Sequence, residues 1–174
     1  MEVRNIHQFI EGFQRFQSKY FSGEKKLYDK LSGGQNPTTL LIGCCDSRVD
    51  PALLLDCDPG DIFVIRNVAN LVPPCNETGN QQGVSAAIQF AVEALQVQRI
   101  IVMGHEKCGG IRALMQGYKP SRKIDFIGRW MRIVEPVKKK FSVDFRIAVW
   151  TCKIMPVSWV RLFCRSIICV VFHG

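Results

Sequence analysis

The spacing of apolar residues along the chain predicts strands and helices in alternation. Three short apolar runs are typical of buried strands, and they cover residues 38–43, 62–65 and 99–103. Four segments have the spacing or composition of helices, and they cover residues 5–20, 84–97, 109–116 and 121–137. Strands that alternate with helices predict an α/β fold, in which a mostly parallel sheet is flanked by helices.

The first of these helices is amphipathic. Its apolar side chains fall on one stripe, made of Ile6, Phe9, Ile10, Phe13, Phe16 and Tyr20. Such a stripe can cover the core of its own chain, or it can pack against a partner subunit. The pattern alone leaves both interpretations open.

The composition narrows the class of protein. The chain has 174 residues, of which 47% are hydrophobic, so it is long and apolar enough for one domain with a buried core. No apolar run approaches the roughly 20 residues of a membrane span, and residues 1–5 lack the apolar segment of a secretory signal. We therefore expect a cytoplasmic protein with no membrane partner, in which the eight cysteines serve metal binding or catalysis rather than disulfides.

The positive charge is concentrated at the end of the chain. The formal net charge is +8, but residues 138–174 alone carry seven Lys or Arg residues and one acidic residue. Residues 1–137 carry sixteen basic residues against fourteen acidic ones and are nearly neutral. This part has no basic stripe with interleaved aromatic residues, so we expect no nucleic-acid partner.

Two short motifs directly follow predicted strands. The sequence GCCDSR (43–48) comes after the first strand, and GHEKCGG (104–110) comes after the third. If the two strands are neighbours, their ends bring Cys44, His105 and Cys108 together. Two thiolates and one imidazole suit Zn²⁺, and three protein ligands leave the fourth tetrahedral position open, as in catalytic zinc sites.

Together, the two motifs resemble those of the β-class carbonic anhydrases, in which CxDSR is followed later in the chain by HxxCGG. The resemblance extends over residues 61–70 (DIFVIRNVAN), and residues 72–74 and 83–88 are similar to the plant-type branch. It covers roughly residues 1–137. It implies a zinc enzyme that reversibly hydrates CO₂ to bicarbonate and a proton through zinc-bound hydroxide.

The resemblance implies a role for each of the main motif residues. Cys44, His105 and Cys108 would be the ligands of one Zn²⁺ per chain. Asp46 and Arg48 would form a catalytic pair beside the metal, in which Arg48 keeps the carboxylate charged and holds it off the open zinc position. Two thiolates cancel the formal charge of Zn²⁺, so the metal would lower the pKa of its bound water less than a histidine site does. The pair of Asp46 and Arg48 would compensate for this.

The resemblance also implies a pocket for CO₂ and bicarbonate. Phe63, Val68 and Phe90 match its apolar wall, which suits a nonpolar linear substrate. Gln35 matches a glutamine that reaches the partner's pocket across the family's dimer interface, so a homodimer or a multiple of dimers is expected. Gly109 would let the backbone approach the site closely.

Three residues depart from the family's pattern. Cys45 stands where Ser is common, and we interpret it as a packed small side chain rather than a ligand or a reactive thiol. Phe90 stands where the plant-type branch usually has Tyr, so a hydroxyl group is lost there. Leu41 takes the place of a tryptophan that lines a regulatory bicarbonate site in one branch, which argues against that regulation here.

Two other functions stay open at this point. An enzyme of the same fold could hydrolyse carbon disulfide or carbonyl sulfide, and the motifs do not discriminate between these substrates and CO₂. A non-catalytic zinc-binding remnant of a truncated enzyme would keep the same ligands.

The chain changes character after Lys140, where the resemblance ends. Of the 34 residues 141–174, 22 are hydrophobic, and they cluster without a clean period. We therefore divide the chain into a zinc domain (1–137) and an atypical tail (138–174). A shifted reading frame, a truncated copy or a divergent C-terminus would each explain the tail. The first two would remove the family's normal C-terminal part and its edge strand, which exposes part of the sheet.

Overall fold

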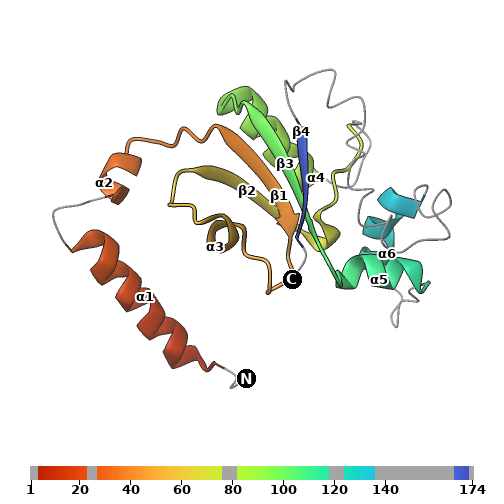
Figure 1. Ribbon diagram of the computed structural model, residues 1–174, viewed down its shortest axis with the longest axis horizontal. Helices are drawn as coiled ribbons and strands as arrows, with labels where there is room; N and C mark the ends of the chain where they lie inside the picture. Colours follow the sequence, from red (N-terminus) through yellow and green to blue (C-terminus); the bar gives the residue numbers. More distant parts are fainter. Residues whose placement is uncertain (1–3, 23–26, 76–81, 118–123, 136–166, 173–174) are drawn as a thin grey trace. The chain divides into compact units, whose positions relative to one another are not determined.

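The computed structural model describes residues 4–22, 27–75, 82–117, 124–135 and 167–172, and the chain divides into two compact units (Figure 1). The first unit, residues 1–36, contains α1 (Ile6–Phe21) and α2 (Leu27–Leu31). A capping box starts α1, because Asn5 and Gln8 each bond the other's backbone N–H through their side chains. The helix predicted over residues 5–20 is therefore confirmed.

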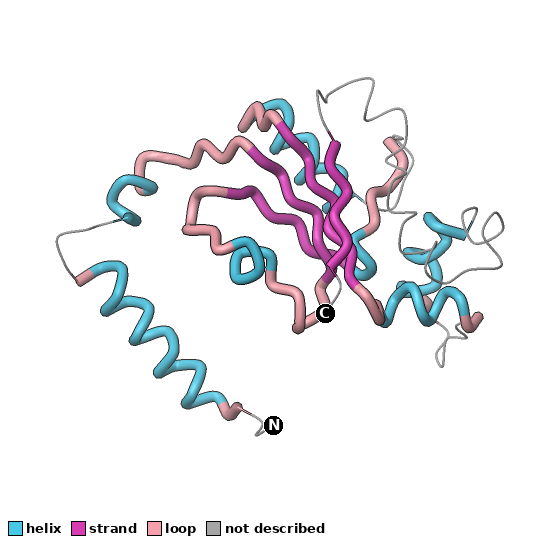
Figure 2. The backbone as a smooth tube through the Cα atoms, viewed as in Figure 1, coloured by secondary structure: helices cyan, strands magenta, loops and turns pink. Residues whose placement is uncertain are grey.

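The second unit, residues 37–174, is built on a four-stranded sheet (Figure 2). Its strands are β1 (Thr39–Cys44), β2 (Ile62–Asn67), β3 (Arg99–His105) and β4 (Ile167–Phe172). They lie in the order β2-β1-β3-β4, and every neighbouring pair is parallel. The predicted α/β fold with a parallel sheet is confirmed, and β1 lies at its centre between β2 and β3.

Helices cover both faces of β1, which explains why its sequence is a continuous apolar run. On one face, α4 (Gln82–Gln89) and the π-helical turn η2 (Phe90–Ala94) pack Ile88 and Ala91 against alternate side chains of β1 and β3. On the other face, α3 (Pro51–Leu55) brings Pro51 so close to Gly43 that a Cβ there would lie 3.4 Å from its ring. All six residues of β1 are buried as a result.

The edge strand β4 comes from the tail, where the sequence predicted no strand. Its backbone pairs with β3 from Ile100↔Ile167 to His105↔Phe172. The sequence left open whether the tail supplies an edge strand, and residues 167–172 form one. The run IICVVF is short, apolar and rich in β-branched residues, which suits a parallel strand although it has no period of its own. The rest of the tail, residues 138–166 and 173–174, lies outside the described residues.

Two further helices follow β3 beyond the carboxyl end of the sheet: α5 (Gly109–Met115) and α6 (Phe126–Met131), which continues as η3 (Arg132–Val134). Met131 of α6 joins a second buried cluster that also holds two cysteines, Cys44 and Cys108. No helix among the described residues combines the length and apolar character needed to cross a bilayer.

A left-handed turn, η1 (Val68–Asn70), follows β2 directly. Ala69 has a φ of +64° and Asn70 a φ of +45°, values that residues with a side chain adopt at a cost of about 1 kcal/mol or more each. The buried Asn67 side chain brackets the turn, because its amide donates to Leu71 O at 2.9 Å and accepts from Leu71 N at 2.7 Å. No pattern in the sequence predicted this turn.

Candidate metal centre

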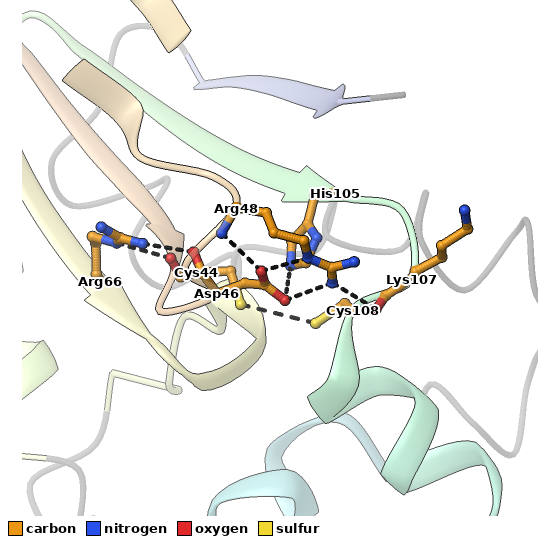
Figure 3. A network of polar contacts seen from close by, with 7 residues as sticks. All are labelled: Cys44, Asp46, Arg48, Arg66, His105, Lys107 and Cys108. Atoms are coloured by element: carbon orange, nitrogen blue, oxygen red, sulfur yellow. Dashed lines mark hydrogen bonds and ion pairs between the residues drawn. The ribbon is translucent and has the colours of Figure 1, made fainter. Parts of the chain in front are cut away.

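Three side chains that can ligate a metal meet at the carboxyl edge of the sheet. Cys44 is the last residue of β1, His105 is the last residue of β3, and Cys108 directly precedes α5. Their two sulfur atoms lie 3.9 Å apart, and the ligand atoms of all three lie within 4.8 Å of one another (Figure 3). All three residues are buried. The structure thus brings together the residues that the sequence singled out.

The geometry of these donors fits zinc. Zn–S bonds of about 2.3 Å in a tetrahedron place two sulfur ligands about 3.8 Å apart, and the sulfur atoms of Cys44 and Cys108 lie 3.9 Å apart. The Nε2 atom of His105 is buried and makes no hydrogen bond among the described residues, and the carboxylate Oδ2 of Asp46 lies 3.9 Å away. Because a buried nitrogen without a partner is costly, a cation bound here would satisfy it.

A hydrogen bond couples the two thiols. It lowers the pKa of Cys44 and raises the pKa of Cys108. The peptide N–H groups of Asp46 and Ala69 also lower the pKa of Cys44. The backbone therefore stabilises negative sulfur at a place where burial opposes it.

Asp46 and Arg48 form an ion pair beside the three ligands (Figure 3). The guanidinium donates to both carboxylate oxygens at 2.8 Å, and the backbone N–H of Arg48 donates to Oδ1 at 3.1 Å. Arg48 also donates to the carbonyl of Lys107 at 3.3 Å, which links the pair to the turn before Cys108.

These hydrogen bonds from Arg48 hold the pKa of Asp46 well below its usual range. Because the folded-state pKa is depressed, the contribution of this pairing to stability is present above the unfolded-state pKa near 3.9. It is lost only as the pH falls through the lowered value. Asp46 is therefore a charged acceptor throughout the neutral range.

Arg66 of β2 fixes the loop that carries these groups. Its guanidinium donates to the carbonyl of Cys44 at 2.9 Å, to the carbonyl of Asp46 at 2.8 Å and to the Asp50 carboxylate at 2.9 Å. Asp50 in turn caps the first turn of α3. The sequence analysis missed Arg66, although its register position opposite Gly43 places it at the carboxyl edge of the sheet.

The turn η1 contacts the ligands from another side. Ala69 packs in the same buried cluster as the two ligand cysteines. Gly110 of α5 lies against the turn, because a Cβ there would come within 3.0 Å of the side chains of Val68 and Ala69. Trp130 of α6 donates its indole N–H to the carbonyl of Val68 at 2.7 Å. Sequence reasoning also missed Trp130, whose partner is a backbone atom and leaves no signal in the sequence.

The residues expected in the substrate pocket are not gathered at one point of this chain. Phe63 and Phe90 contact each other, with ring centroids 5.8 Å apart. Phe63 pairs with Leu40, four residues before Cys44, which corresponds to about 13 Å along the sheet. Val68, in contrast, lies beside α5 near the ligands.

The remaining sequence-predicted residues have varied positions. Gln35 belongs to the first compact unit and Gly109 is the first residue of α5, where a Cβ would meet no atom within 4 Å. Leu41 is fully buried in β1. Cys45 is exposed, so its interpretation as a packed side chain is wrong: β1 ends at Cys44, and the next side chain faces outward.

Comparison with known proteins points to one family. The family model described as carbonic anhydrase matches residues 39–149. A carbonic anhydrase of Synechocystis sp. is 38% identical to this chain over 134 residues, which are 77% of this chain and 48% of that protein. The chain spans about half the length of the curated relatives that it matches.

Solved structures with the same fold are also β-carbonic anhydrases. The β-carbonic anhydrase CcaA matches with a TM-score of 0.72 and 35% identity, over 83% of this chain and 72% of that chain. A structure from a study of two tetrameric β-carbonic anhydrases of Sordaria macrospora matches with a TM-score of 0.60 and 29% identity, over 83% of this chain and 70% of that one.

Replacing Arg66 tests whether its hydrogen bonds stabilise the loop that follows β1. Arg66→Ala leaves two carbonyl groups and the Asp50 carboxylate without this donor, so we expect the free energy of unfolding to fall by about 2 kcal/mol. Arg99→Ala is the matched control, because the exposed Arg99 makes one long bond of 3.4 Å to Thr38, and it should change stability by less than about 0.5 kcal/mol. Urea unfolding of both variants measures the difference, and equal effects would contradict the assignment.

Proposed function

The chain belongs to the β-class carbonic anhydrases, and from this membership we propose that it catalyses the reversible hydration of CO₂ to bicarbonate and a proton at a zinc ion. The observation that carries the proposal is the buried cluster of Cys44, His105 and Cys108, with a charged carboxylate oxygen 3.9 Å from the imidazole. Three protein ligands leave a fourth tetrahedral position for water, which is the pattern of catalytic zinc.

The residues around the cluster divide the work of the reaction. Zinc, when bound, would supply a Lewis acid that lowers the pKa of water toward neutrality. Asp46 can accept a hydrogen bond from that water and orient it, because its Oδ2 accepts one bond from Arg48 and keeps a free acceptor direction. Arg48 holds the carboxylate in place and prevents it from turning toward the cation. Val68 offers apolar surface for CO₂.

The proposal includes a homodimer or a multiple of dimers. Phe63 and Phe90 lie along the sheet, away from the ligands of their own chain, and Phe90 is about half exposed. Side chains in that position, together with Gln35, would line the pocket of a second copy. The tetrameric state of the Sordaria macrospora relatives supports such an assembly.

The proposal is tested by measuring zinc content and CO₂ hydration on the same preparation of the full chain. We expect one zinc per chain, hydration by stopped-flow indicator assay, loss of both on chelation and recovery with added zinc. Cys44→Ser should abolish zinc retention because a hydroxyl replaces a thiolate ligand, whereas the adjacent Cys45→Ser is the matched control and should retain it.

Each other result has a distinct meaning. One zinc per chain without hydration would indicate a non-catalytic metal site. Hydrolysis of carbonyl sulfide or carbon disulfide in place of CO₂ hydration would assign the other substrate class. Zinc retention by Cys44→Ser would contradict the ligand set itself.

The pairing of Asp46 with Arg48 gives a second prediction. Arg48→Ala removes the donors that depress the pKa of Asp46, so that pKa should rise toward its ordinary range and kcat/KM should fall about 100-fold. Zinc content should not change, because Arg48 is not a ligand. Glu93→Gln, on the exposed side of η2, is the control and should leave kcat/KM unchanged. Full activity in Arg48→Ala would exclude the proposed role of the pair.

A further inference from the structure

Val68 presents apolar surface at the carboxyl edge of the sheet, directly after the last residue of β2. That last residue, Asn67, pairs with Cys44 in the sheet register, and its carbonyl accepts a hydrogen bond from the backbone N–H of Cys45 at 3.0 Å. Val68 is 40% exposed, whereas Ala69 after it is fully buried. The turn η1 therefore leaves one apolar side chain open beside the ligands and buries the next.

The position of Val68 depends on strained backbone. Ala69 and Asn70 both have positive φ, and neither is a glycine, so the turn persists only where the surrounding structure holds it. The Val68 carbonyl belongs to the peptide unit that joins Val68 to Ala69, and this unit is planar. A rotation that relieves the positive φ of Ala69 would therefore turn this carbonyl and displace Val68.

Two helices hold the turn against such a rotation. From α6, the indole N–H of Trp130 donates to the Val68 carbonyl at 2.7 Å, a short and therefore well-formed hydrogen bond. The indole ring packs against the buried cluster that contains Met131, which fixes the donor. From α5, Gly110 permits a close approach, because a Cβ there would lie 3.0 Å from the side chains of Val68 and Ala69.

We propose that Trp130 is a positioning residue for the substrate: its hydrogen bond to the Val68 carbonyl holds the strained turn so that the Val68 side chain keeps its place beside the ligands. This inference rests on the proposed function, in which Val68 offers apolar surface to CO₂. Because CO₂ is nonpolar, its binding depends on where apolar surface is placed. Trp130 acts through Val68 and has no contact with CO₂ in this role.

The test compares Trp130→Phe with the parent chain by stopped-flow CO₂ hydration over a range of CO₂ concentrations. Phenylalanine keeps an aromatic ring and removes the N–H donor. We expect KM to rise about 5-fold and kcat per bound zinc to stay within about 2-fold, because a contact made equally before and during the reaction contributes to KM alone. Phe126→Ala is the matched control on α6, since Phe126 is 74% exposed, and should change neither constant.

The separation of KM from kcat distinguishes positioning from a purely structural role. A Trp130 that only stabilised the fold would lower the melting temperature or the active fraction of the preparation when replaced, and KM would stay parental. A parental KM in Trp130→Phe would therefore overturn the proposal.

A double-variant cycle tests whether the effect passes through Val68. Val68→Ala removes the apolar surface itself and should raise KM about 10-fold. If Trp130 acts by placing Val68, adding Trp130→Phe to Val68→Ala should raise KM by less than about 2-fold further. A full further rise of about 5-fold would show that Trp130 acts on another part of the site, and would overturn the proposal.

An isosteric replacement keeps the test decisive if Trp130→Phe does not fold. Site-specific incorporation of 3-benzothienylalanine in place of Trp130 keeps the bicyclic shape and puts a sulfur atom where the N–H was. The same rise in KM is expected, and a parental KM would again overturn the proposal. A parent chain that retains zinc and does not hydrate CO₂ would instead contradict the proposed function, so the two failures are distinguishable.

Discussion

The parallel pairing of β1 with β3 is the constraint on which the rest of the site depends. Two neighbouring parallel strands end at the same edge of a sheet, so a cysteine at the end of one and a histidine at the end of the other are brought together by register alone. The turn after β3 then returns Cys108 to the same point. Burial on both faces fixes this register, because a slip of one residue would turn the apolar side chains of β1 to the wrong faces.

The groups that surround the ligands affect which side chains are charged at the carboxyl edge of the sheet. A buried thiolate is costly, and neighbouring peptide N–H groups oppose this cost by lowering the pKa of the cysteines. The neighbouring carboxylate is kept charged by a bidentate arginine. Arg66 holds the loop that carries the N–H of Asp46, and the turn η1 carries the N–H of Ala69. The contacts that fix the backbone around the ligands therefore also affect the pKa values of the ligand side chains.

The parts of this arrangement that were predictable from sequence are those with a local pattern. The strands β1, β2 and β3 are short apolar runs, and Cys44 and His105 end two of them, so both the fold class and the meeting of the ligands followed from the sequence. Arg66 and Trp130 bond to backbone carbonyls, which have no identity in a sequence, and both were missed. The strand β4 was missed because a continuous apolar run without a period does not distinguish a strand from a packed tail. The domain boundary after residue 137 stays a prediction.

The central claim is that two sulfurs and one imidazole of this chain hold a single zinc with one position open. Zinc K-edge X-ray absorption on the purified, zinc-loaded chain measures this most directly. The account predicts two sulfur atoms at about 2.3 Å and two nitrogen or oxygen atoms at about 2.0 Å, of which one is the imidazole and one is exchangeable. A shell with no sulfur, or with three or four sulfur atoms, would contradict it.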